Sequence, residues 1–542
     1  MVVAQDYLLK CLECGEPFFT PGEKEFYESK NLTIPTRCSK CRELRAMKIS
    51  APKSNDNLLA ASTALTSDIQ DIYNEILDNW SVDAKKESIR YFCHVEEADY
   101  LTSGKKSFII GRKGCGKTAI AQYICELQSP THFSSKLSFK NFPFKILYSL
   151  ENSRDYTQPN QYISIWKYLI YSSICKSMSK NQKIDPEVKG KLEQLYGDSS
   201  LTALDKVITK WTNKSFGVEI LGVGFNRERE KNKENLSWIE ISEILEKIIL
   251  DYCDESSYYI VFDELDEDYT AFSGNQEKND YISMLTSLFK AIQDIRSLFE
   301  TNDKKIYPIG FLRSDIYSQL QYSDKNKWKE SVIDLEWNTA RIQKMLSHRL
   351  CVAFNLPRTE FKTIWEKLFS SKKVSMGHRQ ERLMDIYSYV ERSTEFRPRD
   401  FIQYVKCCVE LAKSKMEYPI MPQTVKDADD NFSEYLKDET IDEVFAVIPE
   451  INEILGLLST IRKQNFRFDA FEKEYNELVK REVIPKRDVK SILLILFDAG
   501  VIGNQPTMRG KTIFRFSAKS PRFNFNEIMM VHRGLYKALQ IF

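Results

Sequence analysis

The stretch Ser107–Tyr123 reads SFIIGRKGCGKTAIAQY, and it decides the fold. Within it, Gly111–Thr118 matches the pattern G-x-x-x-x-G-K-[ST] at every fixed position. Phe108–Ile110 is a short apolar run typical of a buried strand, and Ala119–Leu127 is typical of a helix. A glycine-rich turn between strand and helix points backbone N–H groups inward, and the helix N-terminus adds partial positive charge. The sequence therefore predicts a loop that binds phosphate groups.

Individual residues of this loop have definable tasks. The glycines let the backbone approach a phosphate, Lys117 would reach the β- and γ-phosphates, and the Thr118 hydroxyl would ligate Mg²⁺. A chance match in a glycine-rich turn is the alternative, and the flanking strand and helix argue against it. The candidate ATP-binding residues of the loop are Gly111, Arg112, Lys113, Gly114, Cys115, Gly116, Lys117, Thr118 and Ala119.

A second motif supplies carboxylates. In Tyr258–Asp268 (YYIVFDELDED), an apolar strand ends in Asp263 and Glu264. On the same sheet edge as the loop, Asp263 can hold the Mg²⁺ shell, and Glu264 can orient and activate water for attack on the γ-phosphate. A glutamate directly after the acid predicts a hydrolase of the additional-strand class. A strand expected at Phe144–Tyr148 agrees with that class.

Three arginines are candidates for reading the γ-phosphate. Arg313 follows the strand expected at Ile306–Phe311, and the end of that strand is expected to lie between the two motifs in space. The alternative is a salt bridge of Arg313 with Asp315 or with the acidic residues 266–268. Arg397 and Arg399 stand at a helix start, where Pro398 suits the first turn. In ATPases with a helical lid, an arginine there reaches the β- and γ-phosphates, and a structural ion pair is the alternative. We expect Glu264, Lys117 and Arg313 to be catalytic.

Two C-x-x-C knuckles open the chain, with 23 residues between them. Four thiolates on two knuckles suit tetrahedral Zn²⁺, and a unit this short needs the metal in order to fold. Isolated buried cysteines are the alternative, but they seldom come as two such pairs. The segment resembles a small family of zinc ribbons, through the knuckles and GEKEFYESKNL. The expected ligands are Cys11, Cys14, Cys38 and Cys41.

The end of the chain is basic. Residues 461–542 hold 16 Lys and Arg against 8 Asp and Glu, a net charge of +8. We expect a helix at Asp488–Val501, a strand at Gly510–Phe516 and a helix at Asn526–Leu539, the pattern of a winged helix. Such domains bind DNA through phosphate contacts and a wing. Binding to proteins is the alternative. The candidate wing contacts are Arg509, Lys511 and Arg515.

Composition sets the remaining bounds. The chain has 542 residues, 42% hydrophobic residues, a net charge of +1 and twelve cysteines, which predicts a globular, multidomain protein. No apolar run approaches the ~18–20 residues of a membrane helix, and the N-terminus lacks the features of a signal peptide. We therefore expect a cytoplasmic protein with no membrane contact.

The fold class expected is an α/β P-loop core with a parallel sheet, a zinc ribbon, a helical lid and a C-terminal winged-helix-like domain. The expected divisions are 1–50 (zinc ribbon), 51–90 (linker and helix, with 51–62 as the linker), 91–338 (ATPase core), 339–435 (lid) and 436–542 (winged helix).

From Tyr91 onward, the layout resembles bacterial ATPases of the STAND and origin-recognition-like branch of the AAA+ superfamily. The resemblance rests on GRKGCGKT, FDELDE, FLRSDI and FRPRD, then the winged-helix-like end. GRKGCGKTAIAQ with FDELDE is similar to P-loop ATPases found among mobile and antiviral defence genes. That resemblance implies an ATP-driven switch whose output is executed by a partner effector protein and, by analogy, a homo-oligomer.

Three functions compete at this point. The first is an ATP-hydrolysing switch, which the glutamate after Asp263 favours because it serves no purpose in a purely structural site. The second is a nucleic-acid-binding module with a structural nucleotide, and DNA is its candidate partner. The third is a scaffold in which ribbon and winged helix both bind proteins.

Overall fold

The computed structural model describes residues 58–138, 162–196, 238–266, 275–320, 328–377, 381–506, 512–517 and 521–541, except 87, 128 and 446. It also gives two short paired strands, β1 (Leu9–Lys10) and β2 (Pro17–Phe19). Several expected features lie outside these residues. They are the four knuckle cysteines, the strand at Phe144–Tyr148, and the wing residues Arg509 and Lys511.

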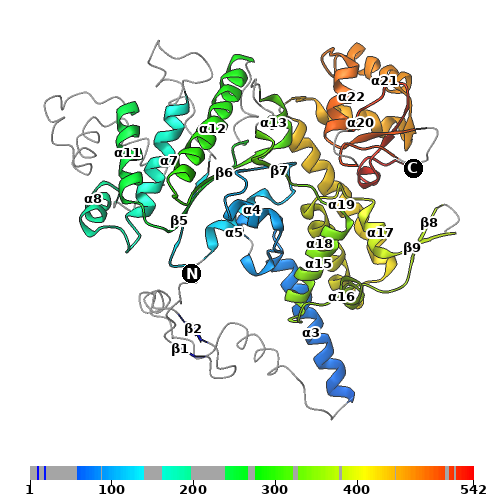
Figure 1. Ribbon diagram of the computed structural model, residues 1–542. Coiled ribbons are helices and arrows are strands. Elements are labelled where there is room, and N and C mark those ends of the chain that lie inside the picture. The colour runs from blue at the N-terminus through cyan, green and yellow to red at the C-terminus, as the bar shows by residue number, and fades with distance from the viewer. Residues whose placement is uncertain are drawn as a thin grey trace.

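A five-stranded parallel sheet forms the centre of the α/β core (Figure 1). Its order is β4–β5–β6–β3–β7. The strands are β3 (Phe108–Gly111), β4 (His132–Ser138), β5 (Ser257–Asp263), β6 (Ile306–Arg313) and β7 (Val332–Asp334). Because β6 lies between β3 and β5, one additional strand separates the phosphate loop from the acidic motif, which confirms the predicted class.

Helices cover both faces of this sheet, as two-sided burial of a parallel sheet requires. Ile109 faces α4 (Glu96–Thr102) and α5 (Lys117–Glu126) in one apolar cluster. Its neighbours Phe108 and Ile110 point to the opposite face and join a second cluster. The helices on that face are α7 (Ile163–Met178), α8 (Pro186–Tyr196), α11 (Trp238–Tyr252) and α12 (Asn275–Thr301).

A helical body follows the sheet. It contains α13 (Ser314–Gln319) at the core edge, then α15 (Thr339–Ala353), α16 (Phe361–Leu368), α17 (Ile386–Glu391), α18 (Pro398–Ser414) and α19 (Pro422–Val444). A hairpin of β8 (Val374–Met376) and β9 (Arg382–Met384) projects from it (Figure 1). Pro398 occupies the first turn of α18, as expected.

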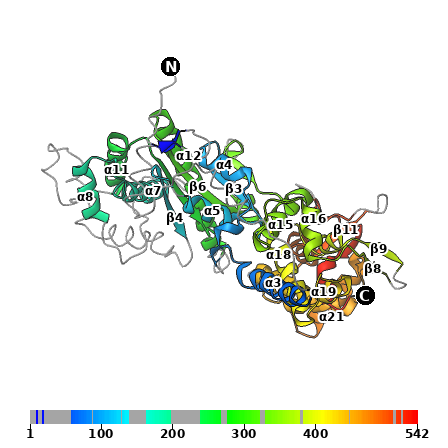
Figure 2. The same ribbon diagram turned by 90° about the horizontal axis from the view of Figure 1, so that it is seen from below.

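Helix α3 (Leu58–Asn79) packs on this body although it precedes the ATPase core in sequence. The Tyr73 hydroxyl donates to the Glu417 carbonyl at 2.6 Å, and Trp80 is fully buried in the same cluster. Figure 2 shows α3 beside α18. Because α3 begins at Leu58, residues 58–62 of the expected linker are helical.

The C-terminal region contains α20 (Ile451–Ile461), α21 (Phe468–Lys480) and α22 (Val489–Asp498). Its antiparallel sheet has the order β10–β12–β11, formed by Asn465–Phe466, Ile528–Val531 and Ile502–Gln505. Three helices with a small sheet agree with the winged-helix expectation. One apolar cluster joins this region to α15–α19 and α3, and α19 runs through the boundary expected at 435/436.

Two predictions in this region were wrong. Asn526–Leu539 is no helix: β12 occupies its first half, and a 3₁₀ turn at Arg533–Leu535 follows. The apolar residues of Ile528–Val531 take the central position in the sheet, so tertiary pairing outweighs the helical spacing that the segment shares. The strand expected at Gly510–Phe516 is reduced, within 512–517, to a single bridge between Ile513 and Asn504.

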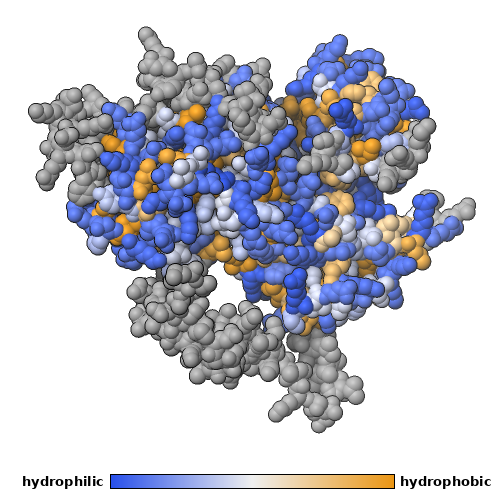
Figure 3. All heavy atoms as spheres, in the orientation of Figure 1, coloured by the Kyte–Doolittle hydropathy of each residue, from blue (hydrophilic) through white to orange (hydrophobic). Residues whose placement is uncertain are grey.

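The surface in Figure 3 is mostly hydrophilic, with apolar residues scattered over it. Among the described residues, no helix has the length and apolarity to cross a bilayer.

Candidate nucleotide-binding site

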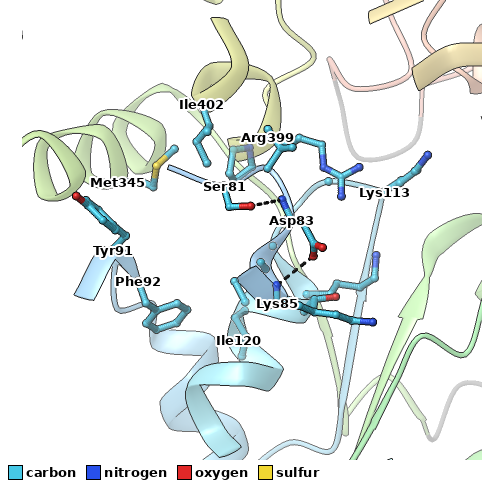
Figure 4. A pocket seen from close by; sticks show the side chains of 18 of the residues that line it. Ser81, Asp83, Lys85, Tyr91, Phe92, Lys113, Ile120, Met345, Arg399 and Ile402 are labelled. Carbon is cyan, nitrogen blue, oxygen red and sulfur yellow. Dashed lines mark hydrogen bonds between the residues drawn. The ribbon is translucent and has the colours of Figure 1, made fainter. Parts of the chain in front are cut away.

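A cavity of about 490 Å³ lies where the phosphate loop, the end of β5 and the start of α18 meet. Figure 4 shows Lys113 and Arg399 on one side of it and Tyr91 and Phe92 on the opposite side. One end is therefore cationic, and the other is apolar and aromatic, as a nucleotide with phosphates and a base requires. Met345 and Ile402 add to the apolar end.

The phosphate loop has the backbone that its glycines predict. β3 ends at Gly111, and α5 begins at Lys117. Gly114 and Gly116 have φ of 78° and 96°, in the left-handed region that disfavours other residues. A Cβ on Gly114 would also lie 3.3 Å from the Cβ of Arg399, so α18 packs closely against the loop.

Lys117 points back onto its own loop. Its Nζ donates to the carbonyl oxygens of Gly111 and Arg112, at 3.0 Å each. Those two carbonyls are weaker partners for an ammonium than phosphate oxygens, which carry full charge. Lys117 is thus placed to transfer to phosphates when these enter the loop.

Thr118 and Asp263 come together across 145 residues of sequence. Thr118 Oγ1 lies 3.4 Å from Asp263 Oδ1, and Lys136 Nζ from β4 lies 2.9 Å from Asp263 Oδ2. Hydroxyl and carboxylate oxygens are the hard donors that Mg²⁺ prefers, so these two residues fit the ion. Ala119 and Cys115 complete the loop, and the Cys115 carbonyl accepts from Trp337 Nε1 at 2.7 Å.

Glu264 is held by two side chains that sequence reasoning did not identify. Ser138 donates a hydrogen bond to it, and Lys85 forms an ion pair with it. Glu264 also adopts a φ of 61°, which is unusual for a residue with a side chain. Burial raises the pKa of Glu264, but the hydrogen bonds and positive charges of Lys85, Ser138 and Lys136 outweigh it and lower the pKa below its usual value.

Arg313 lines the cavity, but its guanidinium is already paired with carboxylates. Its guanidinium makes two contacts with Asp315, the shorter of 2.7 Å, and lies 3.7 Å from Asp266. Burial lowers the pKa of Arg313, and Asp315, Glu443 and Asp266 raise it by more, so the side chain stays charged. The structure thus brings Arg313 to the site while showing the ion pair that was the alternative interpretation.

The two lid arginines separate in space. Arg399 lines the cavity and pairs with Glu439 at 3.0 Å. Arg397 is 5% exposed, lies at the N-cap of α18, pairs with Asp400 at 3.0 Å and does not line the cavity. Only Arg399 is therefore placed to meet a phosphate, and Arg397 takes the structural role.

The loop and the lid are also joined by charge. Arg112 contacts the Glu395 carboxylate at 3.0 Å and the Glu395 carbonyl at 2.6 Å. Lys113 lies 3.5 Å from Glu439. The C-terminal region reaches the same place, since the Arg112 guanidinium lies 5.5 Å from the Phe516 ring centroid. Three parts of the chain therefore converge on the phosphate loop.

Segment 81–95 supplies most of the residues that sequence reasoning missed. It lines the cavity through residues that include Asp83, Lys85, Phe92 and Val95. The aromatic pair Tyr91–Phe92 lies just upstream of the loop, and the Phe92 ring stacks on Tyr123 with centroids 4.4 Å apart. Lys85 has no local signal, because only the fold brings it to Glu264.

Within the described ranges, no group of three or more His, Cys, Asp and Glu side chains could hold a metal ion. The four knuckle cysteines lie outside those ranges.

Two family models match parts of the chain. One, described as a probable treble clef domain, matches residues 5–48, which contain the two knuckles. The other, described as a FunZ-associated C-terminal helical domain, matches residues 340–440. Among curated proteins, no relative matches.

Solved structures of origin-recognition proteins align over most of the chain, but loosely. Cdc6p from Pyrobaculum aerophilum is 13% identical with a TM-score of 0.28, covering 90% of this chain and 95% of that chain. A chain in the Drosophila ORC structure bound to DNA is 10% identical with a TM-score of 0.27, covering 93% and 99%. The Aeropyrum pernix ORC2 protein is 13% identical with a TM-score of 0.35, covering 81% and 87%. Similarity of this degree does not indicate the function of this chain.

Proposed function

We propose that this protein binds and hydrolyses ATP and acts as a molecular switch. The single observation that carries the proposal is the meeting of Thr118, Asp263 and Glu264 beside a phosphate loop with left-handed glycines. Each group matches a requirement of phosphoryl transfer to water: phosphate binding, ion binding and water activation. A purely structural nucleotide site has no use for Glu264.

The chain's own residues define the steps. Backbone N–H groups of the loop and Lys117 bind the phosphates, and Arg399 approaches them from α18. The Mg²⁺ that Thr118 and Asp263 would hold supplies charge neutralisation at the phosphates. Glu264 accepts a hydrogen bond from the attacking water and orients it. Because Lys85 occupies Glu264, water activation requires that this ion pair open first.

Hydrolysis by purified protein tests the proposal. Glu264→Gln should keep nucleotide binding and abolish turnover, since the amide is nearly isosteric but cannot act as a base. Lys86→Gln is the matched control, because Lys86 lies one residue from Lys85 on the exposed surface. Normal turnover in Glu264→Gln would sink the assignment. In a separate variant, Lys117→Ala should lose nucleotide binding.

The biological context is proposed from the motif resemblance. The switch would act as a homo-oligomer in the cytoplasm, as part of a bacterial antiviral defence system, and a partner effector protein would execute its output. Zn²⁺ bound by Cys11, Cys14, Cys38 and Cys41 would fold the N-terminal domain, and the treble clef match supports this.

DNA binding by the winged-helix-like region is a second proposed function. The net charge of +8 over residues 461–542 favours it. Arg515 is placed by the structure beside Asp498 at 3.5 Å, which reduces its availability as a wing contact. Salt-dependent binding to double-stranded DNA whose affinity does not change with added ATP would favour the nucleic-acid module. ATP hydrolysis that DNA stimulates would favour a switch coupled to DNA.

A further inference from the structure

A second and larger cavity lies away from the nucleotide site. It is a groove of about 1070 Å³ between the helical body and the C-terminal region. The β8–β9 hairpin and α17 form one wall. Residues 512–517, β12 and the chain after it form the other. The proposed hydrolysis uses none of this groove.

Positive charge dominates its lining. Four cations face it, from Arg382, Arg392, Arg533 and Lys537, against the two carboxylates of Glu381 and Glu391. Two of these cations have acidic partners in the fold: Arg533 contacts Asp429 at 2.8 Å, and Lys537 contacts Asp430 at 3.2 Å. Across the described residues, Arg382 and Arg392 form no ion pair.

The charge of Arg392 is only partly compensated. Its Nε is buried and has no hydrogen-bond partner within the described part of the chain. Its guanidinium lies 4.7 Å from the Tyr389 ring centroid, and the guanidinium of Arg533 lies 5.6 Å from the same centroid. Burial lowers the pKa of Arg392, the charge of Arg533 lowers it further, and Tyr389 and Asp429 raise it by less. Asp429 supplies one carboxylate to these two cations, and a further anion between them would still be stabilised.

Aromatic side chains line the same groove. Phe516 is half-buried and stacks on Phe514, with ring centroids 5.3 Å apart. Tyr536 lies under Arg533, whose guanidinium is 5.4 Å from its centroid. Aromatic faces beside arginines are the arrangement that stacks a nucleobase while its phosphate is bound.

We propose that this groove is a second binding site, for a ligand that combines a phosphate with a planar base. Arg392 and Arg533 bind the phosphate, Arg382 approaches it from β9, and Phe516 and Tyr536 contact the base. A free nucleotide and a single-stranded nucleic acid share this chemistry.

The groove is also connected to the phosphate loop. Phe516 lines the groove and at the same time contacts the Arg112 guanidinium. A base that contacts Phe516 and shifts its ring would therefore change one contact of the loop. On the proposed function, this makes the groove the place where a ligand would set the state of the switch.

Isothermal titration tests binding without requiring hydrolysis, so its failure is distinct from failure of the proposed ATPase. The full-length protein carries Lys117→Ala to disable the phosphate loop. The probes are thymidine 5′-monophosphate, single-stranded hexathymidylate, and thymidine as the control without phosphate. Variants Arg392→Gln and Arg382→Gln are compared with Arg358→Gln, an exposed arginine outside the groove.

We expect one or both phosphate probes to bind, and thymidine to bind far more weakly. Arg392→Gln should weaken binding at least about tenfold, since it removes a charge-assisted hydrogen bond. Arg358→Gln should bind as the parent does, and the tighter probe identifies the source of the ligand. Arg382 lies on the exposed surface, so the affinity of Arg382→Gln for the probes tests the proposal if Arg392→Gln does not fold. Absence of binding at millimolar concentration, or equal affinity in the groove and control variants, would overturn the proposal.

Discussion

Replacing Lys85 by methionine should raise the basal rate of ATP hydrolysis. Lys85 forms an ion pair with Glu264, and a carboxylate engaged by an ammonium is a poor acceptor for the proton of water. Methionine keeps the length and the apolar stem of the side chain while it removes the charge. The Ser138 hydrogen bond to Glu264 remains, so the carboxylate stays in place.

The magnitude follows from exposure. The Lys85 side chain is 37% exposed and that of Glu264 is 10% exposed. An ion pair this open to water contributes about 1 kcal/mol, so its loss corresponds to about a fivefold increase in kcat.

Steady-state hydrolysis at saturating ATP and Mg²⁺ measures this effect, with Lys86→Met as the matched neighbour. The pH profile adds a second readout. Because Lys85 lowers the pKa of Glu264, its removal should move the acid limb of kcat to higher pH. A kcat in Lys85→Met that is unchanged or lower than that of the parent would refute the reasoning. Lys85 would then act on the phosphates or on folding instead. The double variant with Glu264→Gln should show no turnover.

Three further outcomes are expected. Arg112→Ala leaves the buried Glu395 with fewer partners, which should lower the free energy of unfolding by about 1–3 kcal/mol in chemical denaturation, whereas an unchanged midpoint would show that Arg397 alone neutralises Glu395. Burial lowers the pKa of His532 to about 4, so its contribution to stability is present above about pH 6.5 and is lost as the pH falls toward 4. The midpoint of thermal unfolding should therefore depend less on pH in His532→Asn than in the parent, and an equal dependence would contradict this expectation. Purified protein should contain about one zinc per chain by elemental analysis, Cys38→Ser should lose it, and full zinc content in that variant would exclude Cys38 as a ligand.

Local patterns made much of the site predictable. The phosphate loop and the acidic motif each depend on a strand followed by a few fixed residues, so their chemistry can be read within about ten positions. The meeting of Thr118 with Asp263 then follows from parallel strands whose carboxyl ends share one sheet edge. Pro398 similarly marked the start of α18.

The remaining features depend on tertiary structure. Lys85 reaches Glu264 only because α3 packs on the lid and directs the chain back across the sheet edge. Arg313 and Arg397 have the residue type of phosphate sensors, and their acidic neighbours in space decide how far each is committed elsewhere. The segment at Asn526–Leu539 has helical spacing, but its partners β10 and β11 decide that it forms a strand.

The shared apolar cluster of α3, the lid and the C-terminal region has a mechanical consequence. Buried residues of α3, of α15–α19 and of the C-terminal region pack in one continuous interior, so these parts have no internal plane along which to slide. Movement is then concentrated at the seam with the sheet domain, which the described chain crosses at 80–95 and again at 335–339. A fragment ending at residue 435 would expose Phe432 and remove Leu436 from that interior. We therefore expect the lid and the C-terminal region to move together as one body.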